Sequence, residues 1–265
     1  MDKKTYRNPV IPGQFADPDI AVFGDRYYLY MTTDGFTGWS GTIFHVFSSE
    51  NLVDWTDEGV ILDVASDDVA WSTGSAWAPT IATRNGKFYF YFCAKDTTGT
   101  SCIGVAVADA PEGPFTAQTE PLMTMDICRR NNIKMGQTID PSVFKDEDGT
   151  YHFTWSCDDT GSPNYHVNYG ISNSIYGPID FKYTVLEKRE QENILGTGHH
   201  CMLQIPGTDE YYIAYHRFFT PLGTYTEGLG LHRETCIDRV TFDKETGLMN
   251  RITPTKEGVE PRYLK

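Results

Sequence analysis

Two aspartates, Asp17 and Asp140, each precede a proline in a short motif, and related motifs in two further segments hold Trp77 and His199. Two carboxylates can cleave a glycoside when one activates a water molecule and the other, in its protonated form, assists the leaving oxygen. An aromatic ring such as that of Phe15 or Trp77 offers a face on which the apolar side of a sugar packs. These residue types therefore indicate carbohydrate chemistry.

The sequence contains no motif for the chemistries that compete with this interpretation. It has no phosphate loop of the form G-x-x-x-x-G-K-[ST], no H-E-x-x-H zinc motif and no G-x-S-x-G nucleophile elbow. Its 22 basic and 36 acidic residues give a formal net charge of −14. Nucleic acids and anionic membranes are bound through clusters of Lys and Arg, so we expect neither as a partner. We expect an oligosaccharide or glycoside substrate, and the oligomeric state stays open.

Runs of aromatic and aliphatic residues recur along the chain, at residues 27–31, 88–92, 151–155 and 211–215, and they begin 61, 63 and 60 residues apart. Each run follows a turn and precedes another strand pattern, and the first three copies close with a turn and a fourth strand pattern around 51–55, 112–115 and 176–179. A repeat of about 60 residues with four antiparallel strands is typical of a β-propeller blade. We predict an all-β fold, a propeller of four blades by count, as a single domain over residues 1–265.

The first strand of each blade lines the central axis of a propeller, so the motifs near the starts of these strands converge at one mouth. The convergent set is Asp17, Ala78 flanked by Trp77, Asp140 and His199. Taken alone, an Asp-Pro pair is most often part of a turn, and a single histidine is most often a core residue. The repeat favours a functional interpretation of both aspartates, because it brings them to one axis.

Ordered segments of the chain resemble the landmarks of glycoside hydrolase family 43. They are Arg7-Asn8-Pro9-Val10-Ile11, Phe15-Ala16-Asp17-Pro18, Trp77-Ala78-Pro79-Thr80-Ile81, Ile139-Asp140-Pro141-Ser142-Val143-Phe144 and Gly196-Thr197-Gly198-His199-His200. Members of that family are five-bladed propellers that hydrolyse arabinosyl, xylosyl or galactosyl linkages with inversion of configuration. The resemblance implies that this chain cleaves terminal residues of that kind from plant-type glycans.

The same resemblance implies roles for individual residues. Asp17 would be the general base that activates water, and Asp140 would tune the pKa of the acid and help to orient it. His199 would lie on the axis beneath the sugar, where some members hold a calcium ion through water; no cofactor is otherwise expected. Arg233 matches a late active-site arginine, whose planar fork can hold a carboxylate or sugar hydroxyls. Together with Phe15 and Trp77, His199 and Arg233 are the expected substrate-binding residues.

One landmark of the family is missing, the glutamate that serves as general acid and opens the fourth blade. Only 59 residues separate Asp140 from His199, which leaves room for one blade where the family has two. Glu112 stands in a Glu-Gly-Pro sequence, but its position in the second repeat is typical of a turn. Glu192 and Glu227 are alternative acids, and catalysis by the two aspartates alone is another alternative.

Two non-catalytic hypotheses stay open beside hydrolysis. One is a carbohydrate-binding pseudo-enzyme that has lost its acid, and the other is a propeller used only as a protein-interaction scaffold.

Six cysteines without any C-x-x-C pair are expected to be free thiols. No apolar run has the length of a membrane span or a signal peptide. We therefore expect a soluble protein, either cytoplasmic or, if a leader has been removed, periplasmic or secreted. If the tail 240–265 pairs with residues 1–14, the two termini together can close the last sheet.

Overall fold

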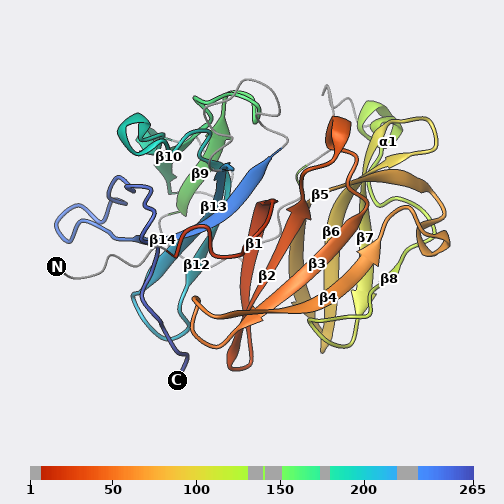
Figure 1. Ribbon diagram of the computed structural model, residues 1–265, viewed down its shortest axis with the longest axis horizontal. Coiled ribbons are helices and arrows are strands. Elements are labelled where there is room, and N and C mark those ends of the chain that lie inside the picture. Colours follow the sequence, from red (N-terminus) through yellow and green to blue (C-terminus); the bar gives the residue numbers. More distant parts are fainter. Residues whose placement is uncertain (1–6, 131–139, 141–150, 174–179, 220–231) are drawn as a thin grey trace. The chain divides into compact units, whose positions relative to one another are not determined.

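A computed structural model of the chain describes residues 7–130, 140, 151–173, 180–219 and 232–265, in which the strands form four antiparallel sheets (Figure 1). The first sheet runs in the order β1 (Phe15–Phe23), β2 (Arg26–Thr33), β3 (Ile43–Ser49), β4 (Trp55–Asp63). The second runs β5 (Ser72–Arg84), β6 (Lys87–Asp96), β7 (Ser101–Ala108), β8 (Thr116–Ala117). Each of these sheets is one repeat of the sequence, with its strands in chain order.

The other two sheets each have three strands within the described residues. One contains β9 (Tyr151–Cys157), β10 (His166–Ser172) and β11 (Asp180–Leu186), and the other contains β12 (Gly198–Gln204), β13 (Tyr211–Phe218) and β14 (Arg233–Val240). The four aromatic runs form the strands β2, β6, β9 and β13, as predicted. The predicted all-β fold with four repeats is therefore confirmed.

The fourth strands begin slightly later than the sequence pattern suggested. Asn51 accepts the backbone N–H groups of Val53 and Asp54 at 3.0 and 2.8 Å, so the segment before Trp55 is a turn closed by a side chain. The Gly113 N–H likewise donates to the Ala110 carbonyl at 3.1 Å, and β8 starts only at Thr116. The predicted segment 176–179 lies outside the described residues, and β11 begins directly after it.

The chain divides into two compact units, which we describe separately. The first unit holds residues 17–144 and 263–265, and therefore the first two sheets. Its core is formed by alternate residues of the strands, so that Tyr30, Phe44 and Phe90 are fully buried and their rings pack with centroids 5.1 and 5.8 Å apart. Burial of each such ring contributes roughly 1.5–3 kcal/mol before the cost of ordering the chain.

A glycine in the middle of β7 shows how tightly this core is packed. Phe92 stacks on Trp71 with centroids 5.9 Å apart, and a Cβ atom at Gly104 would come within 2.6 Å of the Trp71 ring. Only a residue without a side chain fits there, because both rings lie directly against the strand backbone.

The second unit holds residues 1–16 and 145–262, with the third and fourth sheets. Asn8 joins the N-terminal segment to its last strand: the Asn8 side chain accepts the Ile237 N–H at 2.9 Å and donates to the Thr255 carbonyl at 3.0 Å. The Val10 N–H donates to the Thr235 carbonyl at 2.9 Å. Residues 7–10 therefore bond both to the tail and to the last sheet, and residues 1–6 lie outside the described part.

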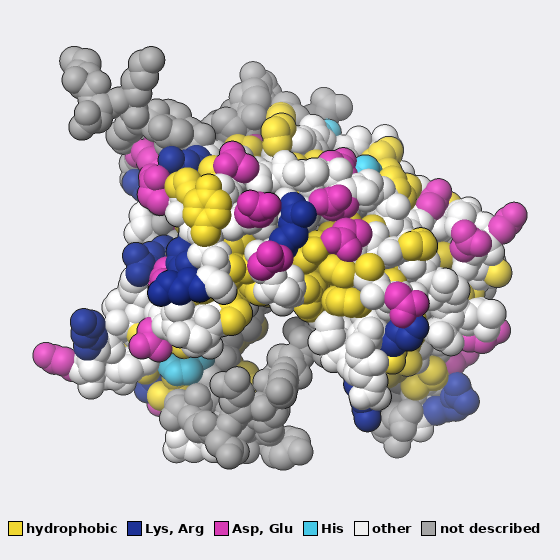
Figure 2. All heavy atoms as spheres, turned by 90° about the horizontal axis from the view of Figure 1, so that it is seen from below, with side chains coloured by type: hydrophobic (Ala, Val, Ile, Leu, Met, Phe, Trp, Pro, Cys, Tyr) yellow, Lys and Arg dark blue, Asp and Glu magenta, His cyan; other side chains and the backbone are white. Residues whose placement is uncertain are grey.

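Helices are few and short within the described residues: α1 (Met125–Arg130) and the 3₁₀ turns η1 (Thr37–Trp39), η2 (Asp67–Val69) and η3 (Glu190–Glu192). Among them there is no helix with the length and hydropathy that crossing a bilayer requires. Acidic side chains are spread over the face shown in Figure 2, with basic ones among them.

The cysteines whose side chains are described are all free thiols, as expected. They are Cys93, Cys102, Cys157, Cys201 and Cys236. The side chain of Cys128 lies outside the described part of the chain.

Candidate active site

Four residues at the same position of the four repeats have a backbone conformation that side-chain-bearing residues rarely adopt. Asp17, Ala78, Asp140 and His199 have φ values of 50°, 42°, 58° and 40°. Such a conformation costs on the order of 1–3 kcal/mol per residue and is concentrated at functional sites. The repeat therefore marks the four positions that the sequence motifs singled out.

Three of these strained residues are anchored in the same way, through their backbone N–H groups. Ala78 N–H donates to Thr32 Oγ1 at 2.8 Å, Asp140 N–H to Cys93 Sγ at 3.0 Å, and His199 N–H to Ser156 Oγ at 2.9 Å. The three acceptors, Thr32, Cys93 and Ser156, each stand five residues after the start of an aromatic run, and His216 occupies that position in the fourth run. A polar side chain at this position of one repeat thus fixes the motif of the next.

Asp17 is buried, with 5% of its surface exposed. Its Oδ2 accepts a hydrogen bond from Thr32 Oγ1 at 2.8 Å. Because the same oxygen of Thr32 accepts the Ala78 N–H, the one hydroxyl proton of Thr32 is directed at the carboxylate. The arrangement orients Asp17 and stabilises its ionised form, which is the form that a general base needs.

Asp140 is exposed, and its backbone lies against the thiol of Cys93. Burial raises the pKa of Cys93 well above its usual value, and the negative charges of Asp140 and Asp17 raise it further. Both carboxylates therefore act electrostatically on one thiol. Within the first unit, the two predicted catalytic aspartates share Cys93 as a neighbour.

Trp77 is held by its indole N–H, which donates to the Trp39 carbonyl at 2.7 Å. Lys95 Nζ lies 5.3 Å from the centre of the indole ring, so a cation covers one ring face. Phe15 is half-buried at the start of β1, and its carbonyl accepts a hydrogen bond from Thr235 at 2.9 Å.

In the second unit, His199 belongs to a column of stacked rings. Its imidazole stacks on His216 with centroids 6.1 Å apart, and His216 stacks on Tyr165 at 5.6 Å. A Cβ atom at Gly198 would overlap the Tyr165 ring, so the glycine before His199 lets the column approach the strand.

Arg233 lies beside this column and is 3% exposed. Its Nη1 donates to Thr160 Oγ1 at 3.2 Å and lies 3.5 Å from His216 Nδ1. His216 therefore connects the two predicted substrate-binding residues of this unit, His199 and Arg233. His216, Thr32 and Cys93 were not among the predicted site residues. The signal that could have found them is a polar residue at the same place in each aromatic run.

The glutamates considered above that the structure describes have surroundings unlike those of a general acid. Glu192 is 45% exposed and lies 3.5 Å from Arg189 and 3.9 Å from Lys256. Glu112 accepts a hydrogen bond from Tyr28 at 2.6 Å beside the turn predicted for it. Glu227 lies outside the described residues.

A calcium ion prefers six to eight oxygen ligands. The rings of His216 and His200 lie near His199, and no cluster of three His, Cys, Asp or Glu side chains suited to a metal occurs among the residues that the structure describes. A calcium ion held through water, as the resemblance implies, stays a prediction.

Comparison with solved structures confirms the β-propeller fold. The chain resembles a thermostable family-43 glycoside hydrolase with a TM-score of 0.78 and 24% identity, over 98% of this chain and all of that one. It also resembles the GH43_1 enzyme from Xanthomonas citri complexed with xylose, with a TM-score of 0.70 and 21% identity, over 94% of each chain.

Sequence relatives and a family model identify the family. The chain is 29% identical to the Beta-D-galactofuranosidase xynD of Aspergillus niger, over 97% of this chain and 88% of that protein. It is 40% identical to Xylosidase/arabinosidase 43A of Humicola insolens, over 51% of this chain and 41% of that protein. The model of Glycosyl hydrolases family 43 matches residues 6–151 and 147–247. The chain therefore belongs to glycosyl hydrolase family 43.

Proposed function

We propose that this chain removes terminal arabinosyl, xylosyl or galactosyl residues from plant-type glycans with inversion of configuration. The observation that carries the proposal is the buried Asp17 carboxylate, oriented by Thr32 and sharing the surroundings of Cys93 with Asp140. Family membership supports the reaction class. The names of the relatives, which include a galactofuranosidase and a xylosidase/arabinosidase, support the choice of sugars.

In the proposed reaction, Asp17 takes a proton from a water molecule. The oxygen of that water attacks the anomeric carbon on the face opposite the leaving group. Asp140 assists as the second carboxylate that orients the acid and tunes its pKa. Arg233 and His199 bind sugar hydroxyls, and Phe15 and Trp77 offer ring faces to the apolar side of the sugar.

The general acid is the part of this mechanism for which we find no residue within the described part of the chain. The alignment with xynD spans 319 positions, 54 more than the 265 residues of this chain, so at least that many positions lack a counterpart here. The family model matches in two segments that meet at residues 147–151. Both facts support the interpretation that a stretch the length of a blade, with the acid-bearing strand, is missing between Asp140 and His199.

Aryl glycosides test this proposal because their leaving groups differ in how much protonation they need. We expect turnover of dinitrophenyl α-L-arabinofuranoside, β-D-xyloside or β-D-galactofuranoside, and much slower turnover of the methyl glycosides. Asp17→Ala should abolish it, and NMR of the first-formed sugar should show the inverted anomer. Turnover that survives in Asp17→Ala would contradict the role of this base.

The missing acid favours a second candidate, a carbohydrate-binding pseudo-enzyme. That protein would bind xylose or arabinose saturably and would hydrolyse none of the aryl glycosides, including the dinitrophenyl ones. The same set of substrates therefore separates the two functions.

A further inference from the structure

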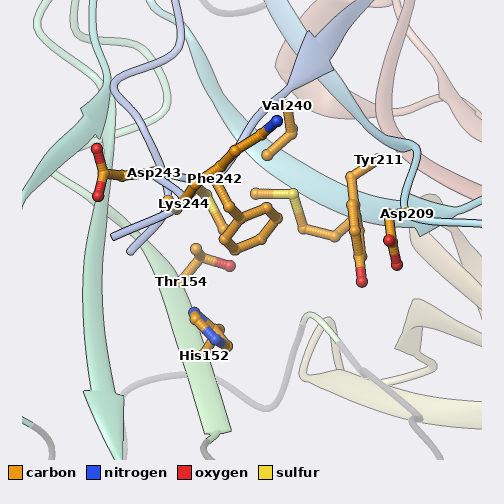
Figure 3. Close-up of a pocket in the computed structure, with 10 residues that line it drawn as sticks. His152, Thr154, Asp209, Tyr211, Val240, Phe242, Asp243 and Lys244 are labelled. Atoms are coloured by element: carbon orange, nitrogen blue, oxygen red, sulfur yellow. The ribbon is translucent and has the colours of Figure 1, made fainter. Parts of the chain in front are cut away.

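The second unit contains a cavity of about 550 Å³ that shares no residue with the candidate active site. It lies between β9, β12, β13 and the segment that follows β14, as Figure 3 shows. It is lined by His152, Thr154, Met202, Asp209, Tyr211, Val240, Phe242, Asp243, Lys244 and Met249. Its volume falls in the range of small-molecule sites, roughly 300–1,000 Å³.

Three rings form a fixed wall of this cavity. Phe242 meets His152 edge-on with centroids 5.3 Å apart and Tyr211 edge-on at 5.0 Å. His152 is in turn stacked on Tyr169 at 5.8 Å, almost parallel. Because each ring is held by another, the wall presents apolar surface in a defined shape.

His152 is held by a hydrogen bond with Tyr169. Tyr169 Oη accepts the Met249 N–H at 3.3 Å and lies 2.7 Å from His152 Nδ1. Burial lowers the pKa of His152, so the ring is neutral at pH 7 and one of its nitrogens carries a proton. Because Nδ1 bonds Tyr169, Nε2 is the ring nitrogen that can form a hydrogen bond with a ligand hydroxyl.

The remaining polar groups balance in charge. Asp209 stands beside Tyr211, Lys244 extends over the cavity, and the Asp243 carboxylate points away from the rings in Figure 3. Asp243 instead accepts the N–H groups of Glu245 and Thr246 at 3.1 and 2.8 Å, which fixes the turn that carries Lys244. One carboxylate and one ammonium at the rim favour a ligand that has no net charge and many hydroxyl groups.

We infer that this cavity is a second, non-catalytic sugar-binding site. A sugar ring fits the shape and the chemistry of this cavity, with an apolar face for the aromatic wall and hydroxyl groups for His152 Nε2, Asp209 and Lys244. The choice of a pentose or hexose as ligand rests on the proposed function, because a hydrolase that holds a glycan at a second site stays close to its substrate.

Two methionines in the lining make the inference directly measurable. In protein labelled with ¹³C at the methionine methyl groups, titration with D-xylose, L-arabinose or D-galactose should shift the signals of Met202 and Met249. Met31, buried in the first unit, is the internal control and should not shift. Methyl signals of Met202 and Met249 that stay in place with all three sugars, or that move equally with Met31, would overturn the proposal.

Variants separate this site from the active site. Tyr211→Ala should raise the dissociation constant obtained from the sugar titration by about tenfold. Lys244→Ala changes an exposed side chain at the rim, leaves the core intact and should raise this dissociation constant as well. Phe181→Ala, which removes an exposed ring on β11, should leave it unchanged. If the aryl glycosides are not hydrolysed while Met202 and Met249 still respond to sugar, the proposed function fails and the second site stands.

Discussion

Thr32 donates its only hydroxyl proton to the carboxylate of Asp17, at 2.8 Å. The next sheet sets the orientation of this hydroxyl, because Thr32 Oγ1 also accepts a hydrogen bond from the Ala78 N–H at 2.8 Å. A single hydroxyl therefore couples the strained backbone at Ala78 in β5 to the proposed base of the first repeat.

Thr32→Val should lower kcat/KM by about 10- to 100-fold, because a hydrogen bond to a charged group contributes roughly 1.5–3 kcal/mol. The acidic limb of the pH–rate profile should also move to higher pH, since the ionised carboxylate loses a donor. Steady-state kinetics on a dinitrophenyl glycoside across pH 3–8 would measure both effects.

The chain offers a matched control for this variant one residue further along. Thr33 donates its hydroxyl to the Ile43 carbonyl at 3.0 Å, so Thr33→Val removes a similar bond away from the carboxylate and should leave the acidic limb in place. Thr32→Ser keeps the hydroxyl and should restore most of the activity. An unchanged pH profile in Thr32→Val would argue against a role in positioning Asp17.

The sequence predicted the sheets well because their signal is local. An aromatic run after a turn buries alternate residues on one sheet face, and four copies at equal spacing leave few other folds. The fourth strands were placed less well, because Asn51 closes its turn through side-chain bonds that composition alone does not locate.

The motif positions were identified from the repeat, but the residues that hold them were not. Thr32, Cys93 and Ser156 each sit in one repeat and bond to the next, 43 to 47 residues along the chain. A contact of that separation depends on how the sheets pack, which no single segment of sequence encodes.

Glu234→Gln should strongly destabilise the protein. Arg217 Nε donates to Glu234 Oε1 at 2.7 Å, and both side chains are only 2% exposed. Removing the carboxylate leaves the Arg217 charge buried without compensation, which costs about 3–5 kcal/mol. Urea unfolding followed by circular dichroism would measure the change in the free energy of unfolding.

An exposed ion pair provides the comparison for this variant. Arg7 lies 2.6 Å from Glu260, whose side chain is 82% exposed, so Glu260→Gln should change stability by less than about 1 kcal/mol. Equal effects of the two substitutions would show that the buried pair makes no special contribution.

His200→Gln should change how stability depends on pH. Burial, reinforced by His199 and His216, lowers the pKa of His200 from 6.5 to about 3, so the folded protein holds this ring neutral. Below about pH 6.5 the His200 ring takes up a proton in the unfolded chain but not in the folded protein. Falling pH therefore favours the unfolded state, and the free energy of unfolding decreases as the pH falls from 6.5 towards 3.

Relative to wild type, His200→Gln should therefore gain stability as the pH falls from 6.5 towards 3, by up to about 1.4 kcal/mol per pH unit. Gln keeps a polar group for Thr154, the partner of His200 Nε2 at 2.7 Å. Urea unfolding at several pH values would give the difference between the two proteins. A difference that does not vary with pH would mean that His200 is not held neutral in the folded state.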